Sequence, residues 1–102
     1  MNLTLREKQS KFVRMIATLI QFAYEAGYEL TFGDAWAKTG HKEGSLHYVR
    51  LAVDFNLFKD GRWLATTEDH RKLGEFWESI GGTWGGRFKD GNHYSLEYEG
   101  RK

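Results

Sequence analysis

The residues of this chain that are best suited to chemistry lie in two short stretches. His47 and Asp54 belong to the first, SLHYVRLAVD, and Asp90 and His93 to the second, DGNH. Two histidines and a carboxylate are enough to hold one zinc ion and to leave a coordination position open, as catalytic zinc sites do. Asp90 precedes His93 by three residues and adds a second carboxylate, which could accept a proton beside such a metal.

These stretches resemble the motif of the zinc D,D- and L,D-peptidases of bacterial cell walls, in which Ser-x-His-x(6)-Asp is followed about forty residues later by an acidic residue, two spacers and His. That family includes D-alanyl-D-alanine carboxypeptidases and dipeptidases, and the L-alanyl-D-glutamate peptidases that bacteriophages use as endolysins. The resemblance covers roughly residues 28–97 and is closest to the small phage endolysins. Its most specific pieces are Ser45-Leu46-His47, Leu51-Ala52-Val53-Asp54 and Asp90-Gly91-Asn92-His93.

The resemblance implies a zinc-dependent peptidase that cleaves the stem peptides of bacterial peptidoglycan. It would be either an L-alanyl-D-glutamate endopeptidase or a D-alanyl-D-alanine carboxypeptidase. His47, Asp54 and His93 would be the zinc ligands, and Asp90 would be the catalytic acid/base. In that role Asp90 would take a proton from the attacking water and pass it to the departing amine.

The chain departs from the family pattern at two places. Many relatives have a glycine two residues before the alanine of the first motif, where this chain has Arg50. Many also carry an arginine near the end of the preceding strand, which helps to bind or polarise the substrate, but residues 33–37 contain none. The sequence does not identify a cation that takes the place of that arginine.

Substrate binding is predicted for Ser45 and Trp84. Ser45 stands two residues before His47, where it could position either the ligand loop or a substrate carboxylate, and Trp84 could line the cleft. No neighbouring base is evident for Ser45, so we do not expect it to be a nucleophile. Glu78 and Glu97 are weaker candidates for the base.

Each of these residues also has an ordinary interpretation. A lone aspartate in a strand usually faces water, and His41, in a glycine-rich loop, is interpreted as an exposed histidine without a ligand role. Asp90 lies in Lys89-Asp90-Gly91, which repeats the turn-like Lys59-Asp60-Gly61. From this repeat alone Asp90 would be a turn residue, whereas the resemblance makes it the catalytic carboxylate.

Composition bounds the function further. With 102 residues, of which 40% are hydrophobic and 28% charged, we expect a single globular domain over residues 1–102, and a monomer. The resemblance implies that this domain is a metallopeptidase catalytic domain. Cysteine is absent, so any zinc must be bound by nitrogen and oxygen. A net charge of only +1 argues against a nucleic-acid partner, because binders of this size are usually strongly basic.

The N-terminal residues turn polar too soon for a secretory signal, and the longest apolar run is short of a membrane span. We therefore expect no stable membrane insertion. The protein should stay in the host cytoplasm until another factor releases it to the cell wall or periplasm, where a bacterial peptidoglycan peptide is its expected partner.

Hydrophobic periodicity predicts the elements that must position these residues. Helices are expected at about 5–26 and 68–80, and strands at 28–32, 48–58, 63–64 and 93–98. Residues 83–88 are expected to form a loop against the site.

One strand-period argument concerns the first motif. His47 and Asp54 are seven residues apart, so a straight strand would point them to opposite faces. The backbone must therefore turn or bulge between Tyr48 and Arg50 if both side chains bind one metal.

The predicted fold class is α+β, with a long N-terminal helix and a second helix packed on a small, mainly antiparallel sheet. The resemblance implies the DD-peptidase/hedgehog-like version of that class. A competing hypothesis is a winged-helix nucleic-acid-binding module, with two helices in residues 31–53 and a wing at 58–63. It leaves the stretch at 90–93 without a role. A third is an inactive phage structural protein that keeps the peptidase fold.

Overall fold

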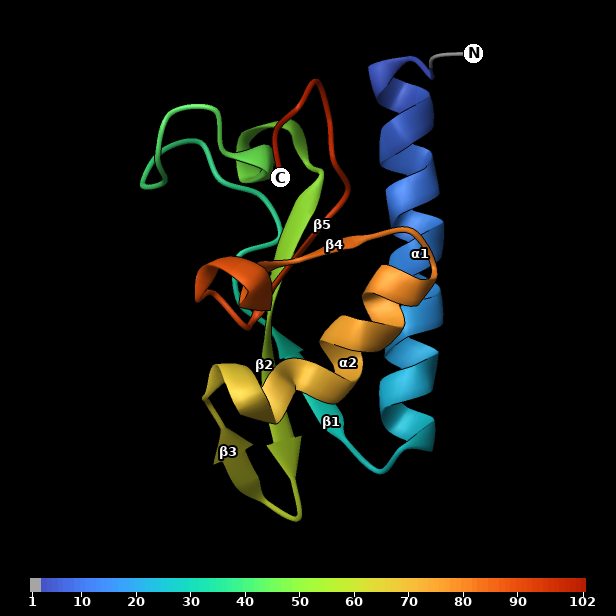
Figure 1. Ribbon diagram of the computed structural model, residues 1–102, viewed down its shortest axis with the longest axis vertical. Coiled ribbons are helices and arrows are strands. Elements are labelled where there is room, and N and C mark those ends of the chain that lie inside the picture. The colour runs from blue at the N-terminus through green and yellow to red at the C-terminus, as the bar shows by residue number, and fades with distance from the viewer. Residues whose placement is uncertain (1–2) are drawn as a thin grey trace.

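A computed structural model describes residues 3–102 of the chain (Figure 1). Within this range two helices, α1 (Leu5–Glu25) and α2 (Thr67–Ser79), pack on a five-stranded antiparallel sheet. The strands are β1 (Glu29–Phe32), β2 (Ala52–Lys59), β3 (Arg62–Leu64), β4 (Thr83–Trp84) and β5 (His93–Ser95). The predicted α+β class is confirmed.

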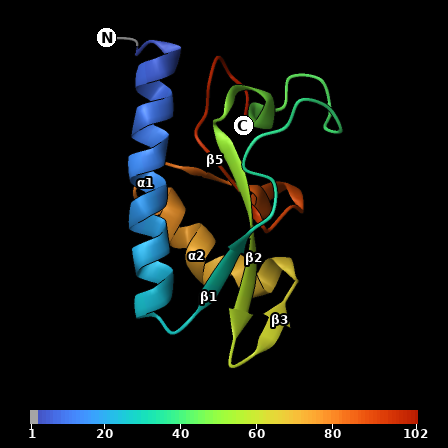
Figure 2. The same cartoon turned by 180° about the vertical axis from the view of Figure 1, so that it is seen from behind.

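The strand β2 is the element on which the sheet is built. Its C-terminal half pairs with β1 and β3, and its N-terminal half pairs with β5, which in turn pairs with β4. Seen from behind, β1 and β2 lie side by side, and α1 runs along the length of the molecule (Figure 2). In the register of β2 and β5, Asp54 stands opposite His93.

Both helices begin at capping boxes. In α1 the Thr4 hydroxyl accepts from the Glu7 N–H and the Glu7 carboxylate accepts from the Thr4 N–H; Thr66 and Asp69 do the same for α2. Such caps satisfy N–H groups that the first helical turn leaves without partners. These signals place the predicted helix ends within one residue of those observed.

The core lies between the helices and one face of the sheet. Side chains alternate along β2, so Val53, Phe55 and Leu57 share the face that the helices cover, together with Tyr94 of β5. The ring of Trp77, from α2, meets Tyr94 edge-on at 6.3 Å. Asp54 and its partner His93 project from the opposite face, so the packed core supports them from behind.

The first motif departs from the predicted strand. Residues Leu46–Val49 form a short 3-10 helix, η1, and Arg50 follows with a φ of 58° before β2 starts at Ala52. This is the turn that a shared metal requires, and it lies where it was predicted. A left-handed φ favours glycine, which explains why a glycine suits this position; here Arg50 adopts it, and its guanidinium lies 4.5 Å over the ring of Trp36.

Two other predicted boundaries were wrong. The last strand ends at Ser95 rather than at Tyr98. Residues 83–88, expected as a loop, form β4 and a second 3-10 helix, η2 (Gly85–Phe88). The winged-helix alternative is wrong, because it needs two helices in residues 31–53. Residues 31–32 and 52–53 lie in strands, and the helical residues between them are the four of the 3-10 helix Leu46–Val49. None of the helices in residues 3–102 is long and apolar enough to cross a membrane.

Candidate metal centre

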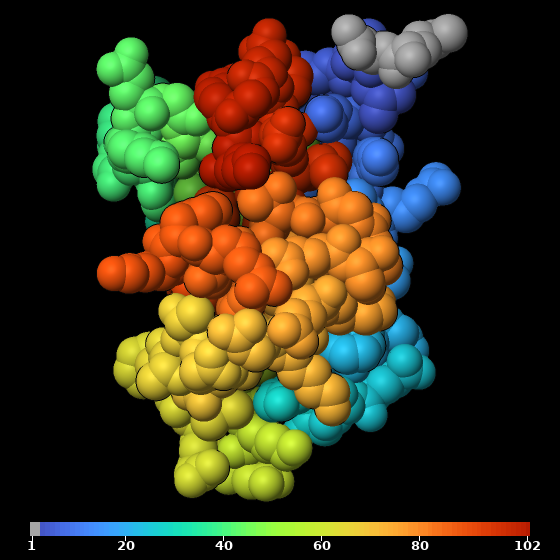
Figure 3. All heavy atoms as spheres, in the orientation of Figure 1, coloured from blue at the N-terminus to red at the C-terminus, as the bar shows by residue number. Residues whose placement is uncertain are grey.

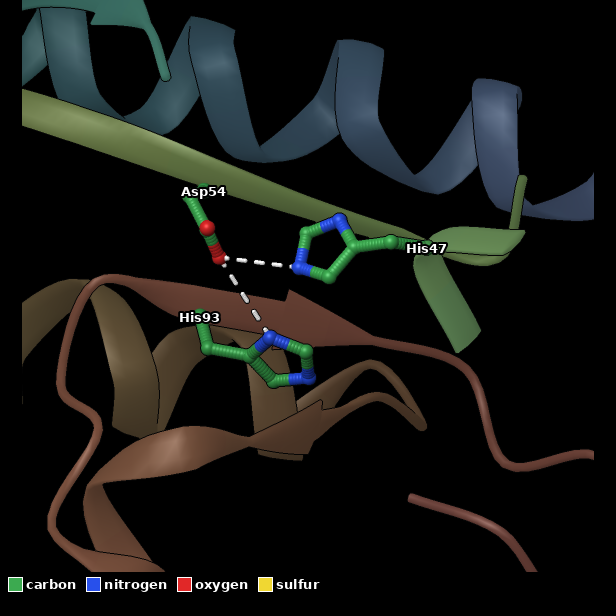
Figure 4. A group of neighbouring side chains, drawn as sticks. All are labelled: His47, Asp54 and His93. Atoms are coloured by element: carbon green, nitrogen blue, oxygen red, sulfur yellow. Dashed lines mark ion pairs between the residues drawn. The ribbon is translucent and has the colours of Figure 1, made fainter. Parts of the chain in front are cut away.

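Three side chains from three elements meet on the open face of the sheet. His47 comes from η1, Asp54 from β2 and His93 from β5. The His47 Nε2 atom lies 3.3 Å from Asp54 Oδ1, and the His93 Nδ1 atom lies 3.4 Å from the same oxygen. Figure 4 shows both rings turned toward this carboxylate. The structure therefore brings together the three residues that the sequence singled out.

The donor set fits zinc. Tetrahedral zinc, with bonds of about 2.0 to 2.1 Å, holds its ligand atoms about 3.3 Å apart. The two separations from Asp54 Oδ1 match this spacing, and one atom from each of the three residues lies within 4.8 Å of the others. The Oδ1 atom is buried and has no hydrogen-bond partner among residues 3–102, so its lone pairs are free for a cation.

The Asp54 carboxyl is held in the form that binds a metal. Burial raises the pKa of Asp54, but the adjacent rings of His47 and His93 together lower it by more, and the pKa falls to about 2. The group is therefore ionised at neutral pH. Metal ligands must be deprotonated to bind, so Asp54 needs no proton release there.

Ser45 and the following turn position His47. The Ser45 side chain is buried, and its Oγ accepts from the His47 N–H at 3.2 Å at the start of η1. The left-handed Arg50 then closes the turn, with its N–H directed to the His47 carbonyl at 3.4 Å. Ser45 also lines the pocket in front of the three ligands. The hydrogen bond therefore holds the loop that carries His47, and the predicted contact of Ser45 with a substrate carboxylate stays a prediction.

A close backbone contact positions the second motif. Gly85 lies so near this segment that a Cβ there would be 2.1 Å from the Asp90 carbonyl oxygen and 2.7 Å from the His93 Cβ. The Asp90 N–H donates to the Gly85 carbonyl at 2.9 Å. Only glycine permits this approach, so Gly85 fixes the loop that carries both Asp90 and His93.

Trp84 supports that loop from the core side and does not line the cleft as predicted. Its ring is fully buried, and its Nε1–H donates to the Gly91 carbonyl at 2.7 Å. A Cβ at Gly74 of α2 would lie 2.0 Å from this ring, so the helix makes room for it with a glycine. The glycine-rich segment indicated a loop folded against the site, but Gly86 packs on the Trp84 ring and Gly85 on the backbone of Asp90.

Asp90 stands beside the three residues that could hold a metal. Its Oδ2 lies 3.9 Å from His93 Nδ1, its side chain is 51% exposed, and it lines the same pocket of about 280 Å³ as the ligands. The competing carboxylates are elsewhere: Glu78 is paired with Arg87 at 2.7 Å, and neither Glu78 nor Glu97 lines this pocket.

The repeated Lys-Asp-Gly sequences have different backbones. At the β2–β3 hairpin Asp60 and Gly61 have φ values of 53° and 77°, as a two-residue hairpin turn requires. In the second repeat the left-handed residue is Lys89, with a φ of 65°, and neither Asp90 nor Gly91 has a positive φ. Asp90 is therefore not a hairpin residue of the Asp60 kind.

Two neighbours of the ligands were not predicted from the sequence. The ring of His41 stacks on the ring of His47, with centroids 4.2 Å apart, and its Nε2 lies 3.0 Å from Asp34 Oδ2. The Asp34 carbonyl accepts from the Asp54 N–H at 2.7 Å. His41 is thus a partly buried neighbour of a ligand rather than an ordinary exposed histidine. No periodicity marks it, since the contact depends on how residues 33–45 fold back.

Comparison with known proteins agrees with this geometry. A family model described as D-alanyl-D-alanine carboxypeptidase matches residues 38–96, more than half of the chain. The matched range contains His47, Asp54, Asp90 and His93. A search of curated proteins found none that matches the chain.

Proposed function

The chain belongs to the D-alanyl-D-alanine carboxypeptidase family, whose members are peptidases that act on peptidoglycan, and on that premise we propose that it is a zinc-dependent hydrolase of stem peptides. The observation that carries the proposal is the convergence of two imidazole nitrogens on Asp54 Oδ1, at 3.3 and 3.4 Å. This spacing is that of zinc ligands, and the pocket in front of them gives a peptide access.

In the proposed site His47, Asp54 and His93 hold the zinc, each through the atom that faces the other two. A zinc ion at this place supplies a Lewis acid that activates water and polarises the scissile carbonyl. Asp54 is the one carboxylate among the three residues, so a bound Zn²⁺ would leave the site with a net positive charge. Such a charge would favour the oxyanion that develops when the amide carbon is attacked.

Asp90 is the proposed proton carrier. Its carboxylate is close to His93 but half exposed, so it can reach a water in the pocket. Asp90 accepts one proton from the attacking water as the C–O bond forms. It then donates that proton to the departing nitrogen as the C–N bond breaks, and the carboxylate is regenerated.

Two bonds of the stem peptide remain as candidates for cleavage. One is L-alanyl-D-glutamate, which small phage endolysins cut, and the other is D-alanyl-D-alanine. The resemblance of the two motifs to phage endolysins supports the first, and the description of the matched family supports the second.

Mass spectrometry of purified peptidoglycan after digestion tests the proposal. We expect new peptide ends at one of these two bonds, loss of the products in the presence of a chelator, and their return when zinc is added. A digest without new ends under zinc-loaded conditions would contradict the proposal and favour an inactive protein that keeps the fold.

A further inference from the structure

Two lysines line the pocket that holds the proposed zinc ligands. Lys42 precedes η1, and Lys102 lies on the C-terminal segment. Neither forms an ion pair with any carboxylate of residues 3–102. An unpaired cation in the wall of a binding pocket attracts an anionic group of the ligand.

A second pocket adjoins the first and has a volume of about 530 Å³. It shares Lys42, Phe88 and Lys102 with the first pocket. Arg101 and Glu43 also line it, and Arg101 lies 3.6 Å from the Glu99 carboxylate. The Arg101 guanidinium is directed to the Gly44 carbonyl at 3.4 Å. It therefore ties the loop before η1 to the C-terminal segment, and Figure 3 shows these two parts side by side at one end of the molecule.

The backbone that carries Lys42 is held in place. The Tyr48 hydroxyl accepts from the His41 N–H at 2.7 Å and donates to the His41 carbonyl. The Lys42 carbonyl accepts from the Ser45 N–H at 3.1 Å. With His41 also stacked on His47, the loop presents Lys42 at a defined place beside the ligands, so little backbone ordering remains for substrate binding to supply.

The arginine within the first motif, Arg50, does not line this pocket. Arg50 lies on Trp36 and lines a separate apolar groove with residues of α1. Among residues 3–102, no lysine or arginine other than Lys42 and Lys102 lines the pocket that contains His47, Asp54 and His93.

We propose that Lys42, assisted by Lys102, binds a carboxylate of the substrate peptide, an inference that rests on the proposed peptidase function. Stem peptides offer two such groups, the free C-terminal carboxylate and the carboxylate of the D-glutamyl residue. The lysine ammonium acts as a point charge for either one. The carboxylate it selects determines which bond lies over the zinc ligands.

The test compares three synthetic stem peptides with the zinc-loaded full chain. One is the free acid, the second has a C-terminal amide, and the third has an amide in place of the glutamyl carboxylate. For Lys42→Gln we expect KM on the free acid to rise by about tenfold or more, the worth of a charge-assisted hydrogen bond, with kcat within about twofold. Lys42→Arg should restore most of the affinity, and Lys72→Gln, exposed on α2, should match wild type.

The amide peptides identify which carboxylate is bound. One of the two amide peptides lacks the carboxylate that Lys42 binds. Its KM with the wild type should be as high as the KM of the free acid with Lys42→Gln. Its KM should not rise further when Lys42→Gln replaces the wild type. Equal KM values for wild type and Lys42→Gln on all three peptides would overturn the inference.

A binding measurement separates this inference from the proposed function. Calorimetry with zinc-loaded Asp90→Asn protein reports the Kd of each peptide without turnover. If the wild type cleaves no peptide, the proposed function fails. Carboxylate recognition would still be supported if the Kd for Asp90→Asn rose about tenfold when the peptide is amidated, or when Lys42→Gln is added to Asp90→Asn. Equal Kd values for the acid and both amides would overturn it.

Discussion

Asp54 and His93 face each other in register across β2 and β5, with His93 Nδ1 3.4 Å from Asp54 Oδ1. Directly opposed residues of an antiparallel pair project from the same face, so the strand pairing itself brings this carboxylate and this imidazole together. A slip of one residue would send one of them into the core. The geometry of the site therefore depends on this register, which the packing of Val53 and Tyr94 against the helices fixes from the other face.

The two Lys-Asp-Gly repeats offer a matched test of the acid/base role. We expect Asp90→Asn to lower the hydrolysis rate by roughly two to four orders of magnitude, because it removes the proton acceptor and keeps the shape of the side chain. Zinc content and melting temperature should stay near wild type. Asp60→Asn, in the hairpin turn, should leave the rate unchanged. Equal rates for the two variants on peptidoglycan would remove Asp90 from the mechanism.

Periodicity, caps and motif resemblance together predicted most of the fold and singled out the three side chains that meet on the open face of the sheet. Capping boxes and apolar spacing are local signals, which is why both helices ended within one residue of their predicted bounds. The contact of His41 with His47 was not predicted because it depends on how an irregular loop folds. The burial of Trp84 was missed because a glycine-rich segment indicates a loop equally well when its glycines permit close packing.

Because Arg50 has a left-handed backbone, we expect glycine at this position to stabilise the protein relative to alanine. A left-handed φ costs a residue with a Cβ about 1 to 2 kcal/mol, and glycine avoids that cost. Arg50→Gly and Arg50→Ala both lose the contact with Trp36, so their difference isolates the backbone. We expect the glycine variant to have the higher free energy of unfolding, by about 1 kcal/mol, in urea denaturation.

In the control, replacing alanine by glycine should change the free energy of unfolding in the opposite direction. Ala17 is exposed in the middle of α1, where Ala17→Gly should lower the free energy of unfolding by about 1 kcal/mol. If alanine proved more stabilising than glycine at position 50 as well, the left-handed turn would not be the conformation in solution.

His70 predicts a loss of stability in mild acid. It is buried on α2 with Nδ1 2.8 Å from the Tyr94 hydroxyl, and burial lowers its pKa to about 4 although Asp69 raises it slightly. The unfolded chain, with an ordinary pKa of about 6.5, takes up a proton first. The contribution of His70 is therefore complete above about pH 6.5 and declines by about 3 kcal/mol as the pH falls to 4.

Urea denaturation of wild type and His70→Gln, with chelator present, measures this dependence. The difference between their free energies of unfolding should shrink as the pH is lowered from about 7 to 4, because the variant lacks the group that titrates. Groups common to both proteins, including His47, Asp54 and His93, cancel in the difference. A difference that stays constant over this range would show that His70 does not titrate on unfolding.

Zinc content per chain tests the central claim most directly, because the whole account depends on one ion held at Asp54 Oδ1. Native mass spectrometry of protein incubated with zinc and then freed of excess should show one equivalent on the wild type, and Asp54→Ala and His93→Ala should each lose it. Glu97→Gln, outside the pocket, should retain it. Less than about a tenth of an equivalent on the wild type, or a full equivalent on Asp54→Ala, would contradict the account.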